Sequence, residues 1–267
     1  MSRRAGDRDD AVAAGGRSAP AAATCDPPRE HVLGVPVDLV DMPEALRRVV
    51  EAVERRRADA GAAPLRIATL NPEMVMRSRR DPALARALRR VDLAIPDGVG
   101  LVAALRRRGH VLDRVAGVDL ITAYAPEAAA RGHRLGLVGA RPGVAAAAAA
   151  ALERRYPGLV VAATDSADPG AALAARLRSA GVEVVLAAYS MEAQAAFVDE
   201  HLVASGAAVG IGVGGSLDIL AGRIRRAPGP VRRAGLEWLW RLGRQPWRVR
   251  RQLDLPRFWI LTRREGG

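Results

Sequence analysis

Between residues 31 and 222, short apolar runs alternate with longer stretches of helical periodicity. This alternation is typical of βαβ units, in which helices connect the strands of a parallel sheet. The apolar runs predict strands at 65–70, 92–95, 133–138, 159–163, 182–188 and 207–213. The helical stretches predict helices near 42–58, 72–90, 98–108, 117–131, 142–155, 169–180, 190–205 and 215–222. We therefore expect an α/β fold with a Rossmann-like parallel sheet and helices on both of its faces.

The composition is that of a folded protein without covalent cross-links. Of the 267 residues, 49% are hydrophobic, which is enough to bury the core of one large domain. Cys25 is the only cysteine, which excludes an intrachain disulfide and indicates a reducing, cytoplasmic location. Residues 1–30 lack the apolar segment of a secretory signal, so we expect a disordered tail there. The longest uncharged stretch, 201–217, is too short and too rich in glycine to span a bilayer.

The last 45 residues, 223–267, differ from the predicted core in charge and in aromatic content. They hold 13 arginines against three carboxylates, and they hold all four tryptophans of the chain. Prolines and glycines divide this segment into predicted short helices near 231–242 and 246–255. Tryptophan favours the boundary between lipid headgroups and hydrocarbon, and arginine favours an anionic lipid surface. We therefore expect a basic, membrane-associating helical appendage.

Two other interpretations of this appendage stay open. Tryptophans that pack the appendage onto the core, with the arginines solvated, explain the composition equally well. A basic, aromatic segment can also bind nucleic acid. The sequence has no helix-turn-helix, zinc-finger or RNP pattern, so we expect no nucleic-acid partner.

Polar side chains mark the points where predicted strands pass into helices, which is where ligands bind in such sheets. Thr69 and Asn71 stand before a helix that begins with proline, and they are candidates for contacts to a polar ligand or, more simply, for a helix cap. Asp97 follows the next strand and is either a general base or part of an ordinary Pro-Asp-Gly turn. Arg114 precedes another helix, as a ligand contact or as a surface arginine.

The last predicted strand ends in a glycine-rich turn. Gly212, Gly214 and Gly215 have the spacing that lets backbone N–H groups approach a diphosphate at a helix N-terminus. A conventional NAD site also needs an acidic residue about 20 positions further on to hold a ribose. Residues 230–235, which lie 20 positions beyond the turn, hold no acidic residue, so the turn favours a nucleotide-sugar diphosphate over a dinucleotide.

Taken in order, these segments resemble the WecG/TagA/CpsF family of bacterial glycosyltransferases over residues 32–251. The most specific motifs are GVGGSLDILAG at 212–222, RAP at 226–228, GLEWLWRL at 235–242 and QPWRVRR at 245–251. Upstream, TLNPEMV, LAIPDGVGLV, RVAGVDL and YPGL are similar to family motifs at similar spacing. The resemblance implies a catalytic core at 31–222 and a functional appendage at 223–267.

The resemblance also implies an activity. An N-acetylmannosamine-type sugar would pass, with inversion, from a UDP donor to N-acetylglucosamine on a polyprenyl diphosphate. The reaction would need no metal and no cofactor, and the protein would act peripherally on the cytoplasmic face of the plasma membrane in cell-surface polysaccharide synthesis.

The resemblance also implies roles for individual residues, according to their positions in the shared motifs. Asp97 resembles the base that deprotonates the acceptor hydroxyl. Thr69, Asn71 and Arg114 resemble pocket residues. Functional arginines of the family's appendage correspond to Arg241, Arg248 and Arg251.

One segment departs from the family pattern. Where the family has G-x-P-K-Q-E, residues 190–195 read SMEAQA and keep only Gln194, which could bind a sugar or lie on a helix surface. The departure leaves open an alternative function, that of a diverged, non-catalytic membrane-associated protein that binds a nucleotide sugar. A homo-oligomer is compatible with the sequence.

Overall fold

The computed structural model describes residues 26–233, 235–244 and 253–265. Its centre is a six-stranded sheet with the strand order β4-β3-β8-β7-β5-β6, in which all neighbours are parallel. The strands are β3 (Leu65–Leu70), β4 (Leu93–Pro96), β5 (Arg134–Gly139), β6 (Val160–Asp165), β7 (Val184–Ala188) and β8 (Val209–Gly212). All six predicted strands are confirmed, with ends that shift by at most two residues.

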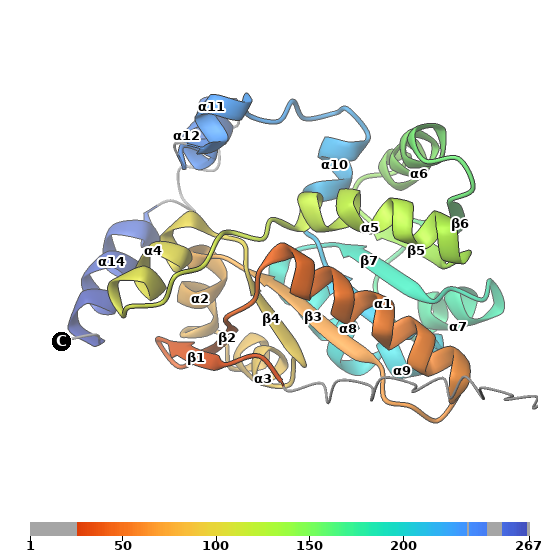
Figure 1. The fold of residues 1–267 in the computed structure, drawn as a ribbon, viewed down its shortest axis with the longest axis horizontal. Coiled ribbons are helices and arrows are strands. Elements are labelled where there is room, and N and C mark those ends of the chain that lie inside the picture. The colour runs from red at the N-terminus through yellow and green to blue at the C-terminus, as the bar shows by residue number, and fades with distance from the viewer. Residues whose placement is uncertain (1–25, 234, 245–252, 266–267) are drawn as a thin grey trace, which may run out of the picture.

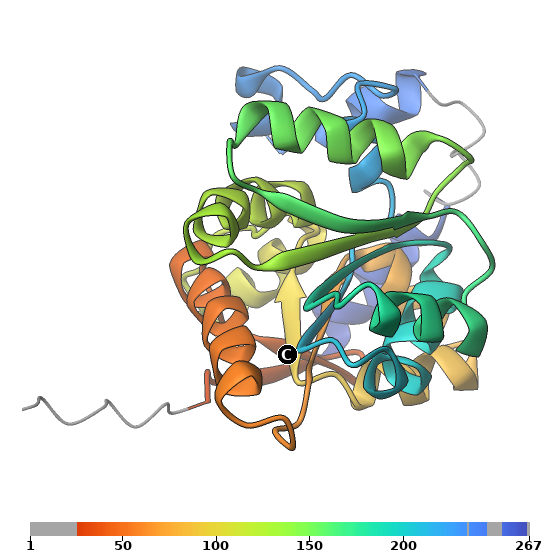
Figure 2. The ribbon, with the colours of Figure 1, turned by 90° about the vertical axis from the view of Figure 1, so that its right-hand side faces the viewer.

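Helices cover both faces of this sheet, as predicted. Because successive side chains of a strand point to opposite faces, Val184 and Leu186 of β7 join one core cluster, and Val185 and Ala187 join another. The first face carries α1 (Met42–Ala58), α5 (Gly117–Arg131), α6 (Val144–Arg155) and α10 (Ser216–Leu220). The second carries α7 (Ala171–Ser179), α8 (Met191–Glu200) and α9 (Leu202–Ser205), so that helices flank the strands on both sides in Figure 2.

Two of the predicted helices are interrupted. The stretch predicted at 72–90 forms α2 (Pro72–Ser78) and α3 (Pro82–Arg89). The break comes from Asp81, whose carboxylate accepts the backbone N–H groups of Ala83 and Leu84 and so starts a new helix. The stretch predicted at 190–205 likewise divides into α8 and α9, and the helix predicted at 98–108 is α4 (Val99–Arg107).

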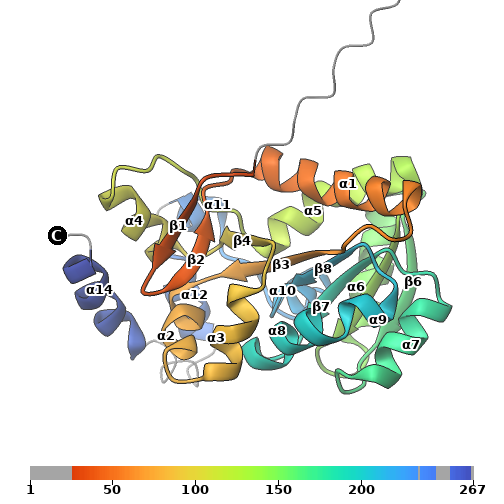
Figure 3. The ribbon, with the colours of Figure 1, turned by 90° about the horizontal axis from the view of Figure 1, so that it is seen from below.

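A small antiparallel hairpin, which the sequence did not predict, precedes the sheet. Strands β1 (Arg29–Val32) and β2 (Val35–Asp38) are joined by a two-residue turn with positive φ at Leu33 and Gly34. The hairpin lies beyond β4, beside α4, at one end of the molecule (Figure 3). Of the expected tail at 1–30, residues 1–25 lie outside the described residues, and Arg29 and Glu30 begin β1.

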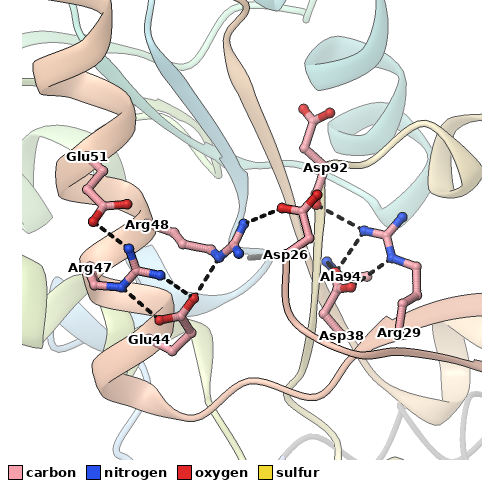
Figure 4. A network of polar contacts seen from close by, with 9 residues as sticks. All are labelled: Asp26, Arg29, Asp38, Glu44, Arg47, Arg48, Glu51, Asp92 and Ala94. Atoms are coloured by element: carbon pink, nitrogen blue, oxygen red, sulfur yellow. Dashed lines mark hydrogen bonds and ion pairs between the residues drawn. The ribbon is translucent and has the colours of Figure 1, made fainter. Parts of the chain in front are cut away.

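An ion-pair network fixes the hairpin at the amino ends of the strands (Figure 4). The buried carboxylate of Asp38 accepts the Arg29 Nε at 2.7 Å and the backbone N–H of Ala94 at 2.6 Å. Nearby, Arg48 of α1 bonds to Asp26 at 3.0 Å. This network lies at the edge opposite to the carboxyl ends of the strands, so we assign it a role in stability.

The appendage consists of α11 (Gly229–Arg233), α12 (Glu237–Arg244) and α14 (Asp254–Glu265) in the described part of the chain (Figure 1). The single helix predicted at 231–242 is wrong, because the chain turns at Gly235 with a φ of +73°. Most of the helix predicted at 246–255 lies outside the described residues. Helix α14 was not predicted because Pro256 reads as a stop, whereas it occupies the first turn, where proline needs no N–H.

Helix α14 packs on the core beside α2 and α4. Phe258 is fully buried in the cluster that these helices form. At the end of the helix, Glu265 accepts the backbone N–H of Leu33 at 2.9 Å and pairs with Arg108 at 2.6 Å. The C-terminal helix is therefore tied both to α4 and to the N-terminal hairpin.

Candidate active site

Three neighbouring strands bring the marked residues together. Because β4, β3 and β8 are adjacent and parallel, Asp97, Asn71 and Gly212 stand at or just beyond the same edge of the sheet. Asn71 caps α2 by accepting the N–H of Met74 at 2.9 Å. The backbone N–H groups of Asp97 and Gly98 both donate to the Leu70 carbonyl, at 2.8 and 2.9 Å. The carboxylate of Asp97 is thus delivered to this edge on a fixed backbone.

Gly98 allows the junction after β4, which carries Asp97, to lie close to the junction after β3, which carries Asn71 and Pro72. A Cβ atom at residue 98 would stand 2.4 Å from Cδ of Pro72 and 2.9 Å from the Asn71 Cα. Both distances are shorter than any ordinary van der Waals contact, so only glycine fits. Gly98 is therefore a packing requirement. Its backbone is extended (φ −82°, ψ 129°) where it precedes α4, so the ordinary Pro-Asp-Gly turn is not formed.

The start of helix α5 faces Asp97. This helix has no side-chain cap, and its first residue, Gly117, points its N–H at Asp97 Oδ2 across 3.4 Å. A negative charge on Asp97 therefore lies at the positive end of the α5 dipole.

The glycine-rich turn after β8 is braced from within the protein. Gln194, which is buried, accepts the Gly214 N–H at 2.9 Å, and its amide packs where a Cβ at Gly212 would stand. Thr69, also buried, donates its hydroxyl to the Gly212 carbonyl at 2.8 Å. Gly215 has open space where a Cβ would be. The structure thus brings Thr69, Gln194 and the glycines together.

Two cavities meet at Asp97. A polar cavity of about 760 Å³ lies over the ends of β3 and β7 and the glycine turn, and Thr69, Tyr189, Gln194 and Gly214 line it. A second cavity of about 360 Å³ extends toward the appendage. The residues shared by both cavities are Asn71, Glu73, Asp97 and Gly215.

The second cavity is walled largely by apolar side chains. Trp238 of α12 and Leu255 and Trp259 of α14 form its appendage side. Val99 and Val118, at the starts of α4 and α5, form its core side. We call this the apolar cavity and the other the polar cavity. The two cavities thus differ in polarity and share two carboxylates, Glu73 and Asp97.

Two roles were considered for the tryptophans of the appendage, namely packing on the protein and contact with a membrane. The Trp259 ring lies under the guanidinium of Arg107, 4.7 Å from its Cζ, and Trp240 donates its Nε1 proton to a backbone carbonyl. Trp238 remains 42% exposed. Trp247 lies outside the described residues. Packing on the protein thus explains Trp240 and Trp259, whereas Trp238 faces both the apolar cavity and solvent.

Charged pairs link the core to the appendage beside the apolar cavity. Arg114 donates to Glu237 at 2.8 Å, and Arg226 binds both carboxylate oxygens of Asp119. Burial by itself raises the pKa of Asp119, but the bonds and charge of Arg226, with Arg114 and Arg232 nearby, outweigh burial and lower it. Asp119 is therefore ionised at neutral pH.

Several site features escaped the sequence analysis. Glu237 lies in the GLEWLWRL motif but was not singled out as a site residue. Tyr189 and Leu255 carried no local signal, because each reaches the cavities only through contacts distant in sequence. The hydroxyl of Tyr189 donates to the Ala167 carbonyl at 2.8 Å, and burial raises its pKa to about 12. Arg241 lies on α12, and Arg248 and Arg251 lie outside the described residues.

The comparison with family models decides what this architecture is. The model of the family described as "Glycosyl transferase WecG/TagA/CpsF family" matches residues 30–266, nearly the whole chain. The chain belongs to this glycosyltransferase family. The resemblance drawn from the motifs is confirmed, and the protein is an enzyme of the glycosyltransferase class.

Two curated relatives of this glycosyltransferase are enzymes of Bacillus species. An N-acetylglucosaminyldiphosphoundecaprenol N-acetyl-beta-D-mannosaminyltransferase of Bacillus spizizenii (strain ATCC 23059 / NRRL B-14472 / W23) is 30% identical over 195 residues, which cover 72% of this chain and 76% of the relative. The enzyme of the same name from Bacillus subtilis (strain 168) is 29% identical over 202 residues, which cover 74% and 79%.

The segment that departs from the family pattern begins α8 of the glycosyltransferase. Ser190 caps this helix by accepting the Ala193 N–H at 3.2 Å. Residues 190–195 therefore form a capped helix start although they differ from the family pattern, and Gln194 contacts the glycine-rich turn. Within the residues that the structure describes, no helix is long and apolar enough to cross a membrane.

Proposed function

We propose that this glycosyltransferase moves an N-acetylmannosamine-type sugar from UDP to N-acetylglucosamine carried on a polyprenyl diphosphate. The observation that supports this most strongly is the position of Asp97 where the polar and apolar cavities meet. The names of the Bacillus relatives state the acceptor and the transferred sugar for those enzymes.

The polar cavity suits the donor. It lies beyond the carboxyl ends of parallel strands, where nucleotides bind in open α/β sheets. In this proposal Thr69, Asn71 and Gln194 shape its floor, and the UDP diphosphate approaches the backbone of the glycine-rich turn at Gly215. The Gly214 N–H is taken by Gln194, and the same side chain packs against Gly212, so these two glycines shape the turn and do not contact the diphosphate.

The chemical step is a single displacement with inversion. Asp97 takes the proton of the acceptor hydroxyl, and the hydroxyl oxygen forms a bond to the anomeric carbon of the donor. The bond from that carbon to the phosphate oxygen breaks, and UDP leaves with the electron pair. A positioned base of this kind contributes roughly 10²- to 10⁴-fold to the rate.

The charge that develops on UDP needs cations beyond those of the polar cavity. Arg77 is paired with Glu192 at 2.7 Å, and Arg80 is paired with Asp254. We therefore propose that Arg241, Arg248 and Arg251 of the appendage stabilise the departing diphosphate without a metal ion.

The acceptor, in this proposal, enters from a membrane surface through the apolar cavity. Large apolar side chains are exposed on the described part of the appendage, namely Leu236, Trp238, Leu239, Leu253 and Ile260. Exposed arginines accompany them on α14. This combination favours an anionic lipid surface, so we place the enzyme peripherally on the cytoplasmic membrane face, with residues 223–267 as the docking appendage.

A product-mass assay tests the function. The protein is incubated with a panel of UDP-N-acetylhexosamines and a short polyprenyl-diphosphate N-acetylglucosamine, and the products are weighed. We expect one added N-acetylhexosamine, from UDP-N-acetylmannosamine, in the presence of EDTA as well as in its absence. UDP-sugar binding without transfer would instead support the non-catalytic alternative.

A further inference from the structure

The apolar cavity contains a buried carboxylate that the proposed reaction does not use. Glu237 is the first residue of α12 and is only 4% exposed. It accepts the Nη2 of Arg114 at 2.8 Å, across 123 positions of sequence, and both residues line the cavity. A buried carboxylate is costly unless it is paired, so Glu237 and Arg114 stabilise one another only while α12 is docked.

A second guanidinium stands on the other side of this carboxylate. The Nε of Arg226 is buried without a hydrogen-bond partner and lies 3.7 Å from the Glu237 Oε1. The two Nη atoms of Arg226 are bound to Asp119 of α5. A movement of α12 by less than about 1 Å would bring the Nε to hydrogen-bond distance. Glu237 thus lies between two arginines that are both anchored near the start of α5.

We propose that Glu237 is a positioning residue that locks α12 over the apolar cavity and holds Arg114 in the cavity wall. This role rests on the proposed function, because the locked helix carries Trp238, which lines the cavity that we assign to the acceptor. Glu237 also stands in the first turn of α12, where a negative charge stabilises the helix dipole. The polar cavity is walled by elements other than α12. We assign Arg241 of α12 only to the charge that develops as UDP leaves, so binding of the intact UDP-sugar does not depend on the lock.

The first test compares Glu237→Gln, which keeps the shape of the side chain and removes its charge, with the wild-type chain. Asp113→Asn is the matched control, because Asp113 is an exposed carboxylate paired with Arg106 just before Arg114. Without substrate, trypsin should cleave within residues 223–267 about 10-fold faster in Glu237→Gln and at the wild-type rate in the control. With substrates, kcat should fall about 10- to 100-fold, the factor typical of a hydrogen bond between charged groups, with the Kd for the intact UDP-sugar changed less than twofold.

The second test exchanges the charges. Arg114→Glu and Glu237→Arg should each lose the resistance to chymotrypsin, which gains no cleavage site from either change, and the double variant should regain part of it. Unchanged cleavage and kcat in Glu237→Gln would overturn the proposal. Loss of UDP-sugar binding together with kcat would also overturn it, because the residue would then act on the whole fold. If the wild-type chain transfers no sugar, the proposed function fails, and the cleavage rates still decide whether Glu237 locks α12.

Discussion

Replacing Gly98 by alanine should uncouple the two junctions that form the site. The added Cβ would stand 2.4 Å from Cδ of Pro72, whereas ordinary contacts begin near 3.4 Å. The start of α2 and the junction that carries Asp97 therefore have to separate by about 1 Å. A displacement of about 1 Å costs roughly 100-fold in rate when catalytic groups lose alignment. Overpacking of this kind also destabilises a fold by about 1 to 3 kcal/mol.

The assay is steady-state transfer with thermal unfolding on the same preparation. For a chain of this size, we expect the melting temperature of Gly98→Ala to fall by about 2 to 12 °C and kcat to fall about 100-fold. Gly170→Ala is the control, because a Cβ at Gly170 meets nothing within 4 Å and its φ of 175° is extended backbone. Wild-type kcat and melting temperature in Gly98→Ala would refute the close packing of the two junctions.

Three further predictions concern the appendage. Phe258→Ala removes a fully buried ring, which costs about 3 to 5 kcal/mol of stability. We therefore expect α14 to detach and trypsin to cleave faster at Arg257, and an unchanged cleavage rate would contradict the packing of α14. The folded-state pKa of Asp119 lies below its unfolded value of about 4, so its stabilisation is complete above about pH 5 and is lost as the pH falls through the folded-state pKa. In denaturant titrations, the stability difference between wild type and Asp119→Asn should therefore stay constant above about pH 5 and shrink below it, and a difference that does not change with pH would contradict this role. Leu239→Ser with Ile260→Ser should reduce sedimentation with anionic vesicles without changing the Kd for UDP, and equal sedimentation would exclude this surface as the membrane contact.

The sheet was predictable because its strands are short, mostly apolar runs, and five of them are buried on both faces, whereas the edge strand β6 is only partly buried. The hairpin was not, because its strands are only four residues long and its turn places Leu33, rather than asparagine or glycine, at positive φ. Helix α14 was missed for a related reason, since a proline marks either a helix end or a first turn, and only tertiary packing distinguishes them.

The candidate site was predictable where its residues follow strand ends and was hidden where they are joined only by contacts distant in sequence. Asp97 and Asn71 were found because they follow adjacent predicted strands, and the structure places them together. The cap considered for Asn71 is also present. The partner of Arg114, by contrast, is Glu237, which lies 123 residues away. No local sequence pattern predicts this ion pair. Long-range ion pairs are fixed by the fold, so the sequence alone does not reveal them.

The central claim is that Asp97 serves as the base between two bound substrates, and Asp97→Asn tests it most directly. Asparagine keeps the size of the side chain and cannot accept the proton of the acceptor hydroxyl. We predict that kcat falls by at least roughly 100-fold while the Kd for UDP stays within twofold of the wild-type value. Transfer at the wild-type rate by Asp97→Asn would contradict the account.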